Sequence, residues 1–134
     1  MRYPKWVTAQ DLDRWAATLQ AKGTLPELVR RLVWATVPQE HLLKVDFPSE
    51  AEIHRPGYDG TTVTRKGTIF VPEGVGFWEL GCDVNDPKGK AQRDYDTRVS
   101  EHNQRIEDGE HEDLSQATFV AVTARRLPAS RELG

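Results

Sequence analysis

The chain lacks the residues and segments that several protein classes need. A single cysteine, Cys82, excludes an internal disulfide and a zinc site built from several cysteines, and it favours a reducing cytoplasm. No apolar run approaches the roughly 20 residues of a membrane span, so we expect no contact with a membrane. Met1 leads into charged residues and proline rather than an apolar stretch, so no signal peptide is expected.

A strong excess of charge of one sign is also missing. The 134 residues include 18 Lys and Arg and 21 Asp and Glu, so the formal net charge of −3 does not indicate a nucleic-acid-binding protein. The charge is uneven, however, because residues 1–44 carry a net +3 and residues 45–134 a net −6. The N-terminal third can supply a basic face, although scatter of surface charges is the plainer explanation.

The apolar residues that are present suffice for one domain. A chain of this length buries about two-thirds of its unfolded surface, and 4 Trp, 3 Tyr and 4 Phe argue against disorder despite a mean hydropathy of −0.64. We expect an N-terminal helix in residues 1–23 and a domain over residues 24–134. The last predicted strand is so apolar that it needs a covering element, so we expect the natural chain to continue beyond Gly134.

Helical patterns fill the N-terminal third. Thr8 is a typical N-cap residue, and apolar residues at helical spacing predict a helix to about residue 22, ended by Gly23. Thr24 and Glu27 have the spacing of a second capping box, which predicts a second helix to about residue 36.

From residue 42 the apolar pattern changes to the alternation of strands. Strand segments are predicted at 42–47, at 61–65 and 68–71 around a bend, and at 75–80, followed by a helix over 90–104 and a strand at 117–124. The continuous apolar run of the last strand predicts burial on both of its faces. Together these elements predict an α/β or α+β fold with a central mixed sheet flanked by helices.

Two acidic residues stand out by their context. Asp59 lies in the glycine-rich turn RPGYDG just before a strand, and Glu79 lies near the end of the apolar strand FWEL. A buried acid is costly unless a partner neutralises it, and a divalent cation between two carboxylates removes their repulsion. We therefore expect Asp59 and Glu79 to bind Mg²⁺ or Mn²⁺, a cation suited to phosphodiester cleavage.

This order of elements and acids resembles the PD-(D/E)xK nuclease superfamily, which has the restriction-endonuclease-like fold. The resemblance covers roughly residues 24–124, from Glu27 in a helix through Asp59 and Glu79 to a helix near Lys90 and an apolar strand. Further resemblance to N-terminal nuclease modules of bacterial defence-type proteins rests on the segments LPELVRRLVWAT, RPGYDG, VPEG, FWELG, KGKAQRDYDTR and TFVAVTARR.

The resemblance implies a metal-dependent endonuclease domain that cleaves duplex DNA in defence against phage or foreign DNA. It also implies a homodimer and a fused or associated ATPase or effector region. The superfamily motif has lysine two residues after the strand acid, where this chain has Gly81. Lys90 or Lys88 is expected to reach the site instead and to stabilise charge on the phosphate. Backbone phosphates are expected to contact the arginines Arg30, Arg31, Arg93 and Arg98.

Each candidate residue also has a structural alternative. Asp59 can cap its own turn, Glu79 can pair with an arginine such as Arg93, and Lys90 can be a solvated lysine at a helix start. The missing motif lysine and the net negative charge favour a second hypothesis, a catalytically inactive module that binds nucleic acid or protein. A third hypothesis is a structural domain in which Glu79 is only salt-bridged.

Overall fold

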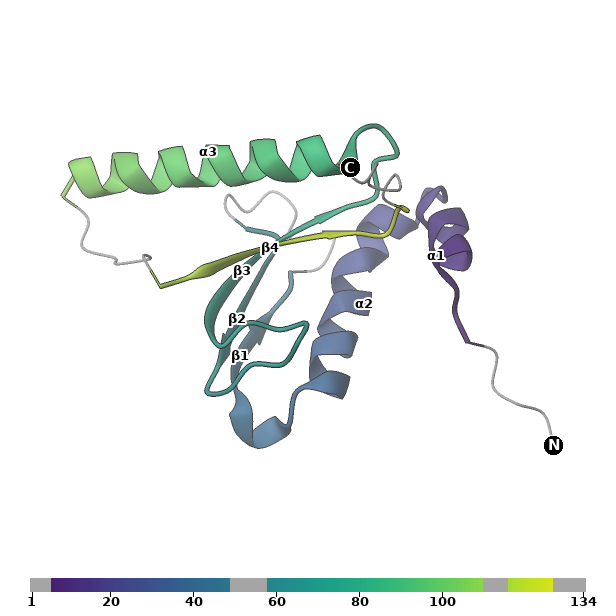
Figure 1. Cartoon of the computed structure of the whole chain (residues 1–134), viewed down its shortest axis with the longest axis horizontal. Helices are drawn as coiled ribbons and strands as arrows, with labels where there is room; N and C mark the ends of the chain where they lie inside the picture. The colour runs from purple at the N-terminus through teal and green to yellow at the C-terminus, as the bar shows by residue number, and fades with distance from the viewer. Residues whose placement is uncertain (1–5, 49–57, 110–115, 127–134) are drawn as a thin grey trace, which may run out of the picture.

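The computed structural model describes residues 6–48, 58–109 and 116–126. None of the helices within those ranges combines the length and the apolar character that a membrane crossing requires. The structure is α+β, with three α-helices and a four-stranded mixed sheet, as the sequence predicts (Figure 1). Its elements are α1 (Ala9–Ala16), α2 (Ala21–Thr36), the short 3-10 helix η1 (Gln39–His41), β1 (Leu42–Asp46), β2 (Gly60–Thr64), β3 (Gly74–Gly81), α3 (Pro87–Glu107) and β4 (Thr118–Thr123).

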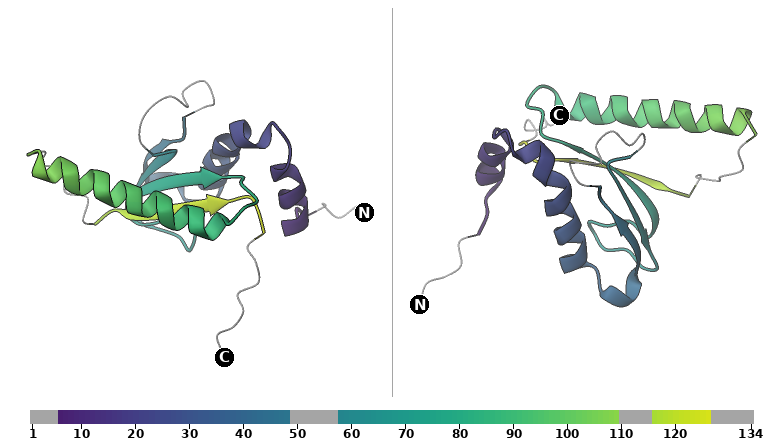
Figure 2. Two further views of the ribbon diagram at one scale, coloured as in Figure 1. Left: turned by 90° about the horizontal axis from the view of Figure 1, so that it is seen from above. Right: turned by 180° about the vertical axis from the view of Figure 1, so that it is seen from behind.

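The sheet has the order β1-β2-β3-β4. The first three strands form an antiparallel meander, and β4 lies parallel to β3, with Gly76 opposite Thr118 and Gly81 opposite Thr123. The parallel pair needs a crossover connection, which includes α3. Helices α2 and α3 lie on opposite faces of the sheet (Figure 2).

The main core lies between α2 and the sheet. Trp78 of β3 is 4 % exposed and packs in a cluster with Val29 and Val33 of α2 and with Phe47. Its indole N–H donates to the Thr62 hydroxyl at 2.9 Å, so the one polar atom of this side chain is satisfied. Because side chains alternate along a strand, the neighbours of Trp78 point to the other face, toward α3.

The first two helices differ from the predicted boundaries. Thr8 caps α1 through a capping box with Asp11, but α1 ends at Ala16 and α2 already begins at Ala21. The predicted stop at Gly23 is therefore wrong, because this glycine lies inside α2. Burial of the apolar face of α2 offsets the cost of an interior glycine, which is about 1 kcal/mol.

The predicted second capping box is also wrong. The Thr24 hydroxyl donates back to the Gln20 carbonyl at 2.9 Å, as threonine hydroxyls do inside helices. Glu27 does not cap the helix but binds Arg30 and Arg31 one turn further along. The spacing of Thr24 and Glu27 is the same in a capping box and inside a helix. Only the earlier start of α2, at Ala21, shows that the two residues are inside the helix.

The predicted strands near residues 42, 61, 75 and 118 are confirmed, as is the long helix α3. The strand segment predicted at 68–71 is wrong. It forms a turn in which the Thr68 amide donates to the Val71 carbonyl at 2.9 Å. Val71 is buried, while Ile69 and Phe70 are 91 % and 71 % exposed. The apolar run therefore comes from one buried residue and two exposed ones, and not from a strand. Residues 56 and 57 of the predicted turn at 56–60, and residues 110–113 of the acidic loop predicted at 107–113, lie outside the described residues.

The prediction that the last strand is buried on both faces is wrong. Strand β4 lies at the edge of the sheet, and its residues are half-buried or exposed. Its apolar run has a different cause, because both faces of the strand contact hydrophobic groups in part. Val120 and Val122 pack against the core beneath α2, and Phe119 contacts Tyr95 of α3 on the other face.

Candidate metal and phosphate site

The antiparallel pairing of β2 and β3 brings the two predicted acids together. Gly60 lies opposite Trp78, so the residue before Gly60 and the residue after Trp78 are neighbours across the two strands. These residues are Asp59 and Glu79. The Asp59 carboxylate also accepts a hydrogen bond from the Leu80 amide at 2.8 Å, which fixes it beside the end of β3.

Glu79 has an unusual electrostatic environment. Glu79 is buried at 8 % exposure and lies next to the Asp59 carboxylate. Burial and the neighbouring Asp59 raise the pKa of Glu79 to about 7, although the hydrogen bond from Arg98 lowers it. Burial and the neighbouring carboxylate thus favour the protonated form of Glu79, and a cation between the two carboxylates would favour the ionised form.

Within the part of the chain that the structure describes, Arg98 of α3 is the arginine that binds Glu79. Its Nε donates to Glu79 Oε1 at 2.7 Å, its Nη1 lies 3.0 Å from Glu101 Oε2, and its guanidinium lies 5.1 Å from the centre of the Tyr58 ring. The sequence predicts Arg98 at backbone phosphates and an arginine such as Arg93 as a structural partner of Glu79, whereas the structure places Arg98 at Glu79.

The helical spacing explains why Arg98 and not Arg93 reaches Glu79. Tyr95 lies on the face of α3 that contacts the sheet, and Arg98 follows it by three residues, which places it on the same side of the helix. Arg93 precedes Tyr95 by two residues and points elsewhere. Its guanidinium lies 3.6 Å from Asp86 in an exposed pair. Tyr95 and Val99 are four residues apart, and this spacing is the sequence signal for the face of α3 that contacts the sheet.

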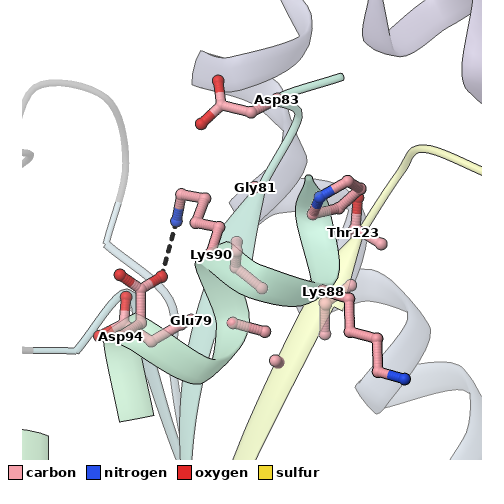
Figure 3. A pocket seen from close by; sticks show the side chains of 12 residues that line it. Glu79, Gly81, Asp83, Lys88, Lys90, Asp94 and Thr123 are labelled. Atoms are coloured by element: carbon pink, nitrogen blue, oxygen red, sulfur yellow. Dashed lines mark hydrogen bonds and ion pairs between the residues drawn. The ribbon is translucent and has the colours of Figure 1, made fainter. Parts of the chain in front are cut away.

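The Lys90 side chain lies beside Gly81, the position at which the superfamily motif has its lysine. A Cβ placed on Gly81 would lie 3.7 Å from Lys90 Nζ and 3.8 Å from its Cδ and Cε, so the lysine side chain passes over the glycine (Figure 3). Lys90 Nζ lies 2.7 Å from Asp94. Burial lowers the pKa of Lys90, but the hydrogen bond to Asp94 and the charges of Glu79 and Asp83 raise it overall, so the ammonium stays charged.

Lys88 does not share this position. Its ammonium points away from Glu79 and Lys90 in Figure 3. Lys88 lines only the smaller of two neighbouring cavities, of about 150 Å³, whereas Lys90 lines both. Of the two candidate lysines, only Lys90 lines the cavity that both Asp59 and Glu79 line.

The larger cavity, of about 270 Å³, lies between the start of α2, the start of β2, the end of β3 and the start of α3. Among the described residues, no group of three or more His, Cys, Asp or Glu side chains is placed to hold a metal ion. The donor set is therefore two carboxylates, which fits Mg²⁺ because this ion keeps several waters. The charged residues that line the cavity are Lys22, Asp59, Glu79, Asp83, Lys90 and Asp94. Lys22 and Asp83 are not among the site residues that the sequence predicts.

The other predicted phosphate-binding arginines lie apart from this cavity. Arg30 Nη2 and Arg31 Nε lie 2.7 and 2.9 Å from the same Glu27 oxygen. The two hydrogen bonds lower the pKa of Glu27 to about 2. Arg30, Arg31 and Arg93 are not among the described residues that line either cavity.

Comparison of the chain with models of protein families, with curated proteins and with solved structures found no match. Function is therefore inferred from the chain's own residues and from the geometry of this site.

Proposed function

We propose that this domain hydrolyses phosphodiester bonds of nucleic acid with a divalent metal ion, and that Asp59 and Glu79 are the protein ligands of Mg²⁺ or Mn²⁺. One observation carries the proposal: two carboxylates meet at adjacent strand ends, and a lysine side chain crosses Gly81 to the same cavity. The order of helices and strands is also the order on which the resemblance to PD-(D/E)xK nucleases depends. That resemblance favours duplex DNA, a homodimer, a defence role and an ATPase or effector region.

Each residue of the site has a separate task in this proposal. Asp59, held by the Leu80 amide, and Glu79 bind the cation, and Glu79 must lose its proton to do so. The bound cation would polarise the phosphate and lower the pKa of a bound water. Lys90 stays charged, and an ammonium has three N–H donors, so it can bind a phosphate oxygen while it keeps Asp94.

A calorimetric titration with Mn²⁺ tests the metal site directly. We expect the wild type to bind Mn²⁺ and both Asp59→Asn and Glu79→Gln to lose binding, because each removes one of two ligand charges. Asp86→Asn is the matched control, since this exposed acid pairs with Arg93 outside the cavity. Unchanged affinity in the Glu79 variant would contradict the proposal.

A cleavage assay then separates the two lysines. We expect plasmid or oligonucleotide cleavage that needs Mg²⁺ or Mn²⁺ and that Lys90→Ala reduces about 100-fold or more, as loss of one transition-state donor does. Lys88→Ala serves as the control and should keep near-wild-type activity. Cleavage that persists in EDTA, or equal losses in both variants, would overturn the assignment.

The second candidate function is a catalytically inactive binding module. It is favoured by the charge balance of the site, because Arg98 already binds Glu79 and Asp94 already binds Lys90. This alternative expects no specific Mn²⁺ binding and no cleavage by the wild type, and it expects any binding of nucleic acid or protein to be independent of metal.

A further inference from the structure

A third hollow, lined by aromatic rings and referred to as the aromatic depression, lies between α3 and the strands β3 and β4. Its volume is about 240 Å³. Helix α3 runs along this side of the sheet (Figure 1). The lining includes four rings, one arginine and one histidine: Tyr58, Phe77, Tyr95, Phe119, Arg98 and His102.

The rings leave an aromatic surface available at Tyr95. Tyr58 and Phe77 stack on one another at 4.3 Å, and Arg98 lies over the Tyr58 ring. Tyr95 contacts Phe119 at 5.4 Å and an interplanar angle of 69°, and no other described ring stacks face to face upon it. Tyr95 is 44 % exposed, so a flat ligand can lie against this ring without unfolding the helix.

This depression adjoins the metal and phosphate site. Tyr58 lines both hollows, and Arg98 reaches from Glu79 to the aromatic lining. The two hollows differ in charge, because no carboxylate among the described residues lines the aromatic one, whereas four line the other. A ligand that spans both must carry a group that binds metal and lysine next to a flat aromatic group that can stack on a ring and an arginine.

We propose that the aromatic depression binds one unpaired nucleobase of the strand whose phosphate lies at Asp59 and Glu79. A nucleotide joins the two required groups covalently. A paired base within a duplex has both faces covered by its neighbours, so a duplex must first extrude a base at a cost in free energy, whereas a single strand offers a base without that cost. Every base offers a π-face, so DNA and RNA are both suitable, and stacking on an aromatic side chain raises affinity about 5- to 150-fold. This inference rests on the proposed function for the position of the phosphate.

Fluorescence anisotropy with labelled 12-nucleotide single-stranded DNA and RNA, and with the 12-base-pair duplex, tests the inference. The measurements are made in Ca²⁺ and again in EDTA. We expect tighter binding of single strands than of the duplex, and a loss of about 5- to 150-fold in Tyr95→Ala. Tyr95→Phe keeps the ring and should stay within about twofold of the wild type. Phe70→Ala, a control at an exposed ring in the β2–β3 connection, should do the same.

Several outcomes would overturn the inference. These are equal affinities of the wild type and Tyr95→Ala, equal affinities for single strand and duplex, or no binding of any oligonucleotide. Thermal unfolding of each variant verifies that it is folded. Mn²⁺ calorimetry on the same variants separates the two proposals. Normal Mn²⁺ binding without dependence on Tyr95 refutes the base site alone. Oligonucleotide binding that depends on Tyr95 but occurs without Mn²⁺ binding refutes hydrolysis and leaves the base site standing.

Discussion

The two faces of the sheet have opposite characters, although the same strand supplies both. On the α2 face, Trp78 is buried among aliphatic side chains and its only polar atom is paired with Thr62. On the α3 face, Glu79 next to it is buried beside a second carboxylate and depends on Arg98. Adjacent residues of β3 thus belong to a core and to a candidate site.

This difference shows how a small domain can hold a costly group. Burying a charge beside a like charge lowers stability, and the apolar packing on the opposite face offsets that cost. The alternation of a strand keeps the two environments about one sheet thickness apart, so substitutions on one face should leave the other largely unchanged. The predictions below test that separation.

The largest effect on stability is expected for Trp78→Ala. It removes the central ring of the α2 face and leaves the Thr62 hydroxyl without its partner, so we expect a loss of roughly 3–5 kcal/mol in the free energy of unfolding. Urea denaturation measures this loss. In buffer without urea, where the variant is still folded, its Mn²⁺ affinity should match that of the wild type. A loss below about 1 kcal/mol would show that this face is not the main source of stability.

Removal of the cation on the α3 face should have the next largest effect. Arg98→Met leaves Glu79 buried without its hydrogen-bonded partner, and we expect a loss of about 2–4 kcal/mol at pH 8. Arg93→Met, which breaks only an exposed pair, should lose under about 1 kcal/mol. The double variant Arg98→Met/Glu79→Gln should recover most of the loss, because the uncompensated charge is gone. Additive losses in the double variant would count against a direct pair.

The pH dependence of stability should come from the α3 face. The pKa of Glu79 is about 7 in the folded protein against 4.5 in the unfolded chain. Between these values the folded state holds the extra proton, so stability falls as pH rises from about 4.5 to 7 and is level above that. Glu79 contributes on the order of 1–3 kcal/mol to this fall. Urea denaturation at pH 4.5, 6 and 8 should show that the free energy of unfolding falls less with pH in Glu79→Gln than in the wild type. Parallel pH profiles of the two proteins would contradict this role of Glu79.

Local patterns were sufficient to predict much of this arrangement. The strand predicted at 75–80 is Gly74–Gly81, and the helix predicted at 90–104 lies within Pro87–Glu107. The meeting of Asp59 and Glu79 also follows from sequence, because consecutive strands joined by a short connection usually pair antiparallel. The missing motif lysine at Gly81 led to the expectation of a lysine from the next helix, and the structure places the Lys90 side chain beside Gly81. A catalytic role for Lys90 stays a prediction.

The remaining features depend on tertiary contacts that local patterns do not contain. Glu27 has the spacing of a capping acid, yet the earlier start of α2 turns it into a partner of two arginines. The apolar run of β4 indicates contact on both faces but not the position of the strand at the sheet edge. The choice of Arg98 over Arg93 depends on how α3 is rotated above the sheet, which the spacing from Tyr95 constrains only once the contact face is known.

The smallest effect is expected at two glycines of β3 that point to opposite faces. A Cβ at Gly81 would meet only Lys90 atoms at 3.7–3.8 Å, which is ordinary contact, so Gly81→Ala should stabilise the protein by about 0.4–1 kcal/mol through the unfolded state. A Cβ at Gly76 would lie 2.7 Å from the Thr62 hydroxyl oxygen and 2.8 Å from Pro72 Cγ. Gly76→Ala should therefore destabilise the α2 face by about 1–3 kcal/mol. Thermal unfolding of the two variants measures the difference. Equal shifts would mean that the α3 face is packed as tightly as the core, and the cavity beside Lys90 would then have no room for a phosphate.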